Sequence, residues 1–275
     1  MERQLVILNP RAGRMQAGRR LGELLPLLES DGVTAELLET KAAGEARAAV
    51  AARAGEFRRV VCIGGDGTLN EVLSGMLEAG QNMPIGYIAA GSTNDFAASH
   101  GISRDILQAA RDIAGGVPTP IDVGTLNGRC FAYTASFGAF TRASYAAPQA
   151  VKNAVGHLAY IFEGIKDLAN IRPYAVTVEA EGEVRSGEFI FGMVGNSTSM
   201  GGVLRLDPRQ IDLHDGKFEV LLVRKPEHIG QLIAAAVALQ SRQYENELLC
   251  FFKAARLHIS APKDMDWTLD GEFQP

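Results

Sequence analysis

The sequence has few cysteines and no pattern among them. Its three cysteines are Cys62, Cys130 and Cys250, and no two of them form a C-x-x-C pair. This spacing excludes a disulfide-stapled scaffold and gives no zinc site. We therefore expect the protein in a reducing compartment.

The sequence also lacks an excess of positive charge and a long apolar run. Its formal net charge is −5, whereas nucleic-acid binders usually carry a basic footprint, so no nucleic acid is expected as a partner. The longest apolar run, at 232–239, is far shorter than the roughly 20 residues that span a bilayer. The opening MERQLVILNP has no signal-peptide pattern. These absences predict a cytoplasmic protein, in which any contact with the inner membrane face is peripheral.

What is present fits a globular protein of two lobes. The 275 residues exceed most single domains, and a composition of 47% hydrophobic and 21% charged residues is ordinary for such proteins. In residues 1–122, apolar runs alternate with helical stretches, which is typical of a parallel sheet covered on both faces. This predicts a doubly wound α/β lobe with strands at 4–9, 33–40, 59–65 and 85–91.

Residues 123–275 show a different pattern, dominated by antiparallel strands. Asn127-Gly128 and the turn at 181–183 each join two strand-like runs, and Asn-Gly favours a type I′ hairpin. Further strands are expected after residue 215, with helices at 148–170 and 226–241. The apolar stripe of the 148–170 helix either lines a lipid cleft or packs in the core. The second lobe is therefore predicted to be β-rich and sandwich-like.

The segment GGDGT, residues 64–68, follows an apolar strand and opens a helix. In open α/β sheets, ligands bind beyond the carboxyl ends of strands, where helix N-termini attract phosphate. The segment is neither a G-x-G-x-x-G fingerprint nor a P-loop and has no lysine at its end. A phosphate here would need Mg²⁺, held by Asp66 and other acids. In isolation the same residues also fit a plain turn in which Asp66 caps the helix.

Two more polar turns follow neighbouring strands of the predicted sheet. They are NPRAG at 9–13 and GSTND at 91–95. Because the carboxyl ends of adjacent parallel strands face one crevice, we expect the three turns to form one site. For 9–13, a plain Asn-Pro turn is the alternative.

Seven segments together resemble the diacylglycerol kinase catalytic-domain family, which includes bacterial soluble lipid kinases and sphingosine and ceramide kinases. GGDGT is shared with NAD kinases, whereas GSTND and LDGE discriminate between the families. Family members usually continue past LDGE with another strand, and this sequence ends at Pro275. In chain order the segments are Asn9-Pro10 with Gly13, Thr40 with Gly44–Ala46, GGDGTLNEV (64–72), GSTNDFA (91–97), PIDVG (120–124), DLHDGKFEV (212–220) and LDGE (269–272).

The resemblance implies an N-terminal nucleotide-binding lobe, a C-terminal lipid-binding lobe and an active site in the cleft between them. It implies ATP as co-substrate, Mg²⁺ as cofactor and a membrane lipid hydroxyl as acceptor, with diacylglycerol, which gives phosphatidic acid, as the first choice. The bacterial members also suggest a homodimer. Alternative acceptors are a sphingoid base, ceramide and phosphatidylglycerol. Alternatives from other classes are an NAD kinase and a non-catalytic lipid or nucleotide sensor.

The resemblance also implies roles for individual residues. Asp270 is the implied general base, although Asp-Gly is also common in hairpin turns. Asp66, Asp95 and Asp122 are the implied acids around the catalytic Mg²⁺, partly through water. Asp212, Asp215 and Lys217 are implied at a structural Mg²⁺, where a plain turn before a strand is the alternative. The implied nucleotide contacts are Asn9, Arg11, Gly13, Thr40, Gly64, Gly65, Asp66, Gly67, Thr68, Leu69, Asn70, Ser92 and Glu272.

Overall fold

The chain divides into two compact units, Met1–Ala132 and Tyr133–Pro275. The computed structural model describes residues 2–13, 16–30, 32–138, 171–200, 204–207 and 209–274. The expected helix at 148–170 lies outside the described residues. The boundary between the two units lies after Ala132, ten residues beyond position 122, because the hairpin at 124–131 belongs to the first unit.

The first unit is built on a parallel sheet of four strands, as the sequence predicts. The strand order is β2-β1-β3-β4, and every pair in it is parallel. β1 and β3 are almost completely buried, which explains why both are continuous apolar runs. The strands are β1 (Arg3–Leu8), β2 (Thr34–Glu39), β3 (Arg59–Gly64) and β4 (Ile85–Ala89).

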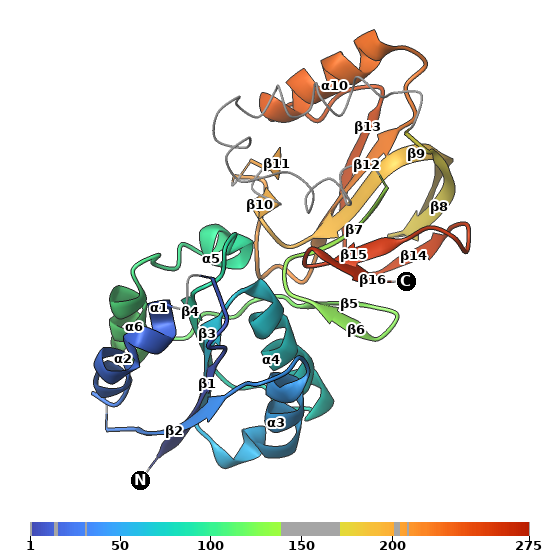
Figure 1. Cartoon of the computed structure of the whole chain (residues 1–275). Coiled ribbons are helices and arrows are strands. Elements are labelled where there is room, and N and C mark those ends of the chain that lie inside the picture. Colours follow the sequence, from blue (N-terminus) through green and yellow to red (C-terminus); the bar gives the residue numbers. More distant parts are fainter. Residues whose placement is uncertain are drawn as a thin grey trace. The chain divides into compact units, whose positions relative to one another are not determined.

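Helices cover both faces of this sheet, so the doubly wound prediction is confirmed (Figure 1). One core joins the sheet to α1 (Gln16–Arg19), α2 (Leu21–Leu28) and α6 (Ile106–Gly115). The other face carries α3 (Glu45–Arg53) and α4 (Asp66–Glu78), which pack closely on each other. Gly75 permits this approach, because an added Cβ there would stand 2.5 Å from the Arg47 carbonyl oxygen.

A buried arginine at the start of β3 joins two helix ends to the sheet. Arg59 is 6% exposed, and its guanidinium donates to the carbonyls of Leu28 at 3.0 Å and Ile113 at 3.1 Å. Its Nε donates to Gln4 Oε1 at 2.7 Å. Since Leu28 and Ile113 lie in the last turns of α2 and α6, the positive charge faces the negative ends of two helix dipoles.

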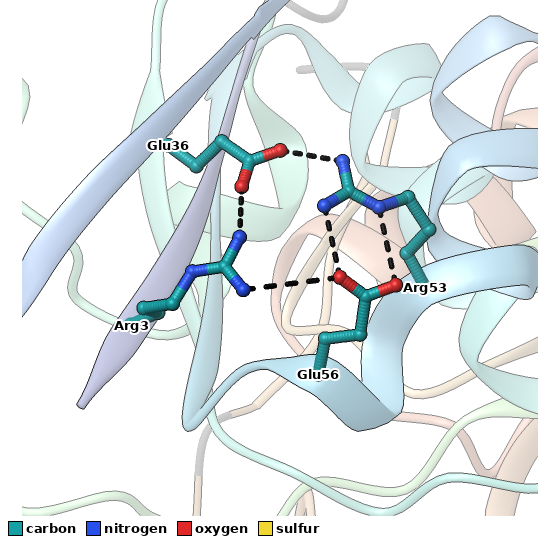
Figure 2. A network of polar contacts seen from close by, with 4 residues as sticks. All are labelled: Arg3, Glu36, Arg53 and Glu56. Atoms are coloured by element: carbon teal, nitrogen blue, oxygen red, sulfur yellow. Dashed lines mark hydrogen bonds and ion pairs between the residues drawn. The ribbon is translucent and has the colours of Figure 1, made fainter. Parts of the chain in front are cut away.

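A second arginine-rich network lies on the surface of the same unit. Arg3 and Arg53 alternate with Glu36 and Glu56, so that each carboxylate contacts both guanidinium groups (Figure 2). Both guanidinium groups also lie over the ring of Phe57, at 4.9 and 5.2 Å from its centroid. The network links β1, β2, the end of α3 and the 3₁₀ turn η1 (Ala54–Glu56).

The hairpin of β5 (Gly124–Leu126) and β6 (Arg129–Phe131) completes the first unit. Its turn residues Asn127 and Gly128 have φ values of 50° and 81°, as a type I′ turn requires. Asn70 of α4 donates to the Cys130 carbonyl at 3.0 Å, which fastens the hairpin to the helix.

The second unit is an antiparallel sheet of eight strands, which confirms the β-rich prediction. The order is β13-β12-β9-β7-β15-β16, with β8 paired to β9 and β14 to β8. The predicted turn at Glu181 and Gly182 joins β8 to β9. The strands are β7 (Thr134–Gly138), β8 (Tyr174–Ala180), β9 (Glu183–Gly195), β12 (Phe218–Arg224), β13 (Leu249–Ala254), β14 (Leu257–Ser260), β15 (Trp267–Leu269) and β16 (Glu272–Gln274).

Among the described residues of this unit, the helix α10 (Ile229–Gln240) packs on the sheet through Leu232 and Ala235. The unit also contains a small ladder of β10 (Ser199–Met200) and β11 (Leu204–Arg205). Across the described parts of both units, no helix combines the length and the apolarity needed to cross a membrane.

Candidate functional site

The three polar turns of the first unit lie together at the carboxyl edge of its sheet. Asn9, which follows β1, donates from Nδ2 to Thr68 Oγ1 at 3.0 Å and from its backbone to Ile63 at 2.9 Å. The backbone of Ala90, which follows β4, donates to the Gly64 carbonyl at 2.7 Å. The turns after β1, β3 and β4 are therefore in mutual contact.

Glycines let these turns approach more closely than side chains would allow. A Cβ added to Gly91 would stand 2.6 Å from the Gly65 Cα, and one added to Gly13 would stand 2.2 Å from the Ala90 carbonyl oxygen. Gly13 also has a φ of 52°, which favours glycine. The glycines at 13, 65 and 91 thus bring three backbone segments into contact.

The N-terminus of α4 differs from that of its neighbour α3. The N-cap residue of α4 is Gly65, which has no side chain that could cap the helix. In α3, the carboxylate of Glu71 accepts hydrogen bonds from the backbone of Gly44 at 2.9 Å and Ala46 at 3.1 Å. An anion at the first turn of α4 would meet no N-cap side chain, whereas Glu71 occupies the end of α3. No sequence pattern indicates this role of Glu71, whose partners lie 25 and 27 residues away along the chain.

Asp66 and Asp95, at the starts of α4 and of the short helix α5 (Asp95–Ser99), lie next to each other. Asp66 Oδ2 accepts from the Asp95 backbone at 3.2 Å, and Oδ1 accepts from the Tyr87 hydroxyl at 3.4 Å. Burial and the charge of Asp66 raise the pKa of Tyr87, so its hydroxyl stays a donor. Asn94, with a φ of 55°, closes the turn by a pair of 2.9 Å bonds to Gly91.

This pair of acids fits a magnesium ion that keeps most of its water. Mg²⁺ is usually held by one or two carboxylates together with waters and substrate phosphates. Asp122 is half-buried in the segment before β5. Within the described ranges, no three histidine, cysteine, aspartate or glutamate side chains are grouped closely enough to bind a metal directly. A role for Asp122 at the ion would therefore act through water.

The other implied nucleotide contacts have different surroundings. Thr40 is buried and its backbone donates to the Leu8 carbonyl at 2.9 Å. Leu69 is 1% exposed, and its backbone N–H donates to the Gly65 carbonyl at 3.1 Å. Arg11 and Ser92 are exposed at the turns. Their contacts with a nucleotide stay predictions.

In the second unit, Asp270 lies at the tip of the β15–β16 hairpin and is 6% exposed. Asp270 and Gly271 have φ values of 49° and 83°, so the hairpin-turn alternative describes its backbone correctly. Its Oδ1 accepts from the backbones of Tyr133 at 2.9 Å and Thr134 at 3.1 Å, and its carbonyl accepts from the Tyr133 hydroxyl at 3.0 Å. The carboxylate is thus held rigidly against β7. Glu272, two residues on, is exposed.

The turn at 212–217 precedes β12 in the second unit. Asp212 Oδ1 accepts from the His214 backbone at 3.2 Å, and Asp215 Oδ1 accepts from the Lys217 backbone at 2.9 Å. Asp215 Oδ2 pairs with the amino group of Lys253 at 3.3 Å. Both oxygens of Asp215 therefore contact groups of the protein.

A parallel sheet that ends in glycine turns, a helix N-terminus and paired acids is typical of nucleotide-dependent phosphotransferases. The family model "Diacylglycerol kinase catalytic domain" matches residues 3–126, and "YegS C-terminal NAD kinase beta sandwich-like domain" matches residues 134–275. The chain therefore belongs to the diacylglycerol kinase family, as its whole-length relatives also show.

Two of these relatives are named diacylglycerol kinase. The one from Bacillus subtilis (strain 168) is 34% identical over 99% of this chain and 90% of its own length. The one from Staphylococcus aureus (strain MRSA252) is 31% identical over 99% of this chain and 86% of its own.

Solved structures agree with the fold. A diacylglycerol kinase from Bacillus anthracis str. Sterne, 21% identical, has a TM-score of 0.73 and covers 98% of this chain and 89% of its own. Another structure from that organism has a TM-score of 0.82 at 25% identity and covers 100% of this chain and 90% of its own.

Proposed function

We propose that this protein transfers the γ-phosphate of ATP to the hydroxyl of diacylglycerol and forms phosphatidic acid and ADP. The observation that carries the proposal is the set of three contacting turns with Asp66 and Asp95, in a chain that matches diacylglycerol kinases over both units. A phosphotransferase needs positioning and charge neutralisation more than covalent chemistry. The turns supply the positioning, and the acids supply a place for a cation that neutralises charge.

The first unit holds the nucleotide in this proposal. Backbone N–H groups of the first turn of α4, which follows Gly65, bind phosphate oxygens, and the glycines at 65 and 91 allow the phosphates to approach the backbone. Asp66 and Asp95, assisted through water by Asp122, would hold Mg²⁺. Bound there, Mg²⁺ would neutralise the charge that develops on the phosphates.

The second unit supplies the general base. Asp270 takes the proton of the lipid hydroxyl. At the same time the hydroxyl oxygen bonds to the γ-phosphorus of ATP, and the bond between that phosphorus and the ADP oxygen breaks. Two backbone N–H groups hold Oδ1 in place, so the carboxylate meets the hydroxyl in a fixed orientation. A base in this role contributes about 10²- to 10⁴-fold to the rate.

A lipid acceptor has consequences for where the protein works. The substrate resides in a bilayer, so we propose peripheral contact with the cytoplasmic membrane face. A homodimer stays a prediction from the family resemblance.

The proposal is tested with labelled ATP, Mg²⁺ and mixed micelles that each carry one lipid: diacylglycerol, a sphingoid base, ceramide or phosphatidylglycerol. A parallel reaction offers NAD in water without lipid. The expected result is label in phosphatidic acid, with far slower transfer to the other lipids. Label in NADP, or in the phosphate of ceramide alone, would contradict the choice of diacylglycerol. ATP binding without transfer to any acceptor would favour a sensor.

A further inference from the structure

The amino group of Lys253 lies between two carboxylates of the second unit. Its Nζ stands 3.2 Å from Glu219 Oε1 and 3.3 Å from Asp215 Oδ2. Lys253 is on β13, Glu219 is on β12, and Asp215 is in the turn that precedes β12. One ammonium group therefore connects two strands and the turn at 212–217.

The buried negative charge of Glu219 is compensated by this ammonium group. Its side chain is 0% exposed, and neither of its carboxylate oxygens accepts a well-aligned hydrogen bond from the part of the chain that the structure describes. On β13 its register partner is Lys253, and on β9 it is Gly195, which offers no side chain. A buried carboxylate without a compensating charge is strongly destabilising. The ion pair with Lys253 supplies that compensation.

The same contact bears on the structural magnesium ion that the family resemblance implies at this turn. Asp215, the implied side-chain ligand, already receives the Lys217 backbone N–H on Oδ1 and the Lys253 ammonium on Oδ2. A divalent ion at Asp215 Oδ2 would stand beside a positive charge, and like charges at this distance repel. The donor set found here therefore does not fit the ion.

We propose that the ammonium group of Lys253 is the resident cation of the 212–217 turn and takes the place of a divalent metal. It neutralises Asp215 and the buried Glu219 together, and it fastens the turn to β12 and β13. The turn consequently keeps its structure without Mg²⁺.

The test is thermal unfolding of the full chain, without ATP or lipid, in EDTA and in excess Mg²⁺ or Ca²⁺. Wild type is compared with Lys253→Met and with the matched control Lys225→Met, which removes an exposed pair to Glu188 at the end of β12. An ion bound at Asp66 shifts the Tm of all three proteins equally, so differences in Tm between them report on the 212–217 turn. No activity is measured, so failure here is distinct from failure of the proposed kinase function.

In EDTA, Lys253→Met should lower the Tm by roughly 10 °C, because it leaves a buried charge unpaired. Lys225→Met should leave the Tm nearly unchanged. Excess Mg²⁺ or Ca²⁺ should raise the Tm of Lys253→Met more than that of wild type, since the ion can then enter the vacated position. An unchanged Tm for Lys253→Met, or equal metal responses of both proteins, would overturn the proposal.

A double variant keeps the test decisive if Lys253→Met does not fold. Lys253→Met with Glu219→Gln removes the buried negative charge along with its partner. The double variant should fold in EDTA and be more stable than Lys253→Met alone. A double variant that is no more stable than the single one contradicts the role assigned to Lys253.

Discussion

Replacing Gly91 by alanine is the sharpest test of whether the turns after β3 and β4 work as one site. The added Cβ would stand 2.6 Å from the Gly65 Cα and 2.8 Å from Asn94 Oδ1. Carbon atoms in contact are normally about 3.5–4.0 Å apart. The atom at 2.6 Å is the backbone Cα of Gly65, so no side-chain rotation can relieve the clash. The two turns must therefore separate by about 1 Å.

A displacement of this size has a calculable effect on the reaction. Misplacing reacting groups by about 1 Å costs on the order of 10²-fold in rate. This corresponds to about 2.7 kcal/mol of transition-state stabilisation. Gly91→Ala should therefore lower kcat/KM for ATP about 100-fold. Gly91 also sets the Asn94 turn that precedes Asp95, so part of the loss should appear in kcat.

The assay is initial-rate transfer from labelled ATP to diacylglycerol in mixed micelles, at a temperature well below the Tm of each variant. The control is Gly22→Ala in α2, where an added Cβ meets nothing within 4 Å. It should keep wild-type kinetics and gain about 0.5–1 kcal/mol of stability, because alanine is the better helix former. If Gly91→Ala retains rates close to those of the control, the close approach of the two turns is irrelevant to the reaction.

Three further predictions concern single side chains. Arg59→Met removes the guanidinium donor from the Leu28 and Ile113 carbonyls, while Gln4 Nε2 still donates to Leu28. It should cost about 2 kcal/mol of unfolding free energy in denaturant titrations; a loss near zero would contradict the buried network. Burial raises the pKa of the Cys62 thiol and Cys130 is also buried, so a thiol reagent should modify the half-buried Cys250 first, and equal rates for all three would contradict this. A hydrogen bond from the neighbouring guanidinium lowers the pKa of Asp207 to about 2, so its stabilisation is present above its unfolded pKa of about 4 and lost as the pH falls toward 2. The Tm values of wild type and Asp207→Asn should therefore converge over that range, and a constant difference would refute the assignment.

Much of the fold could be predicted because its signals are local. Buried parallel strands appear as continuous apolar runs, and the hairpins at 127–128 and 181–182 are marked by Asn127 and by the glycines at 128 and 182, which tolerate positive φ. The order of the eight-stranded sheet could not be predicted. β7 pairs with β15, more than 120 residues away, and β9 is shared by three neighbours. Such pairings depend on packing and leave no periodic signal in either strand.

In the candidate site, too, some features could be predicted from the sequence and others could not. The proximity of the turns after β1, β3 and β4 follows from sheet geometry alone, so it could be predicted. The Glu71 cap of α3 and the hold of β7 on Asp270 are contacts between distant segments, and only the fold reveals them. Lys253 carries no motif, and its importance arises from the register that places it opposite Glu219.

The most direct test of the central claim compares the initial rate of phosphatidic acid formation by wild type, Asp270→Asn and the control Asp264→Asn at saturating ATP. Asp264 is an exposed acid paired with Arg172 in the same unit. Wild type and the control should form phosphatidic acid at similar rates. Asp270→Asn should be slower by about 10²- to 10⁴-fold with ATP binding unchanged. Absence of phosphatidic acid with wild type, or an undiminished rate with Asp270→Asn, would contradict the account.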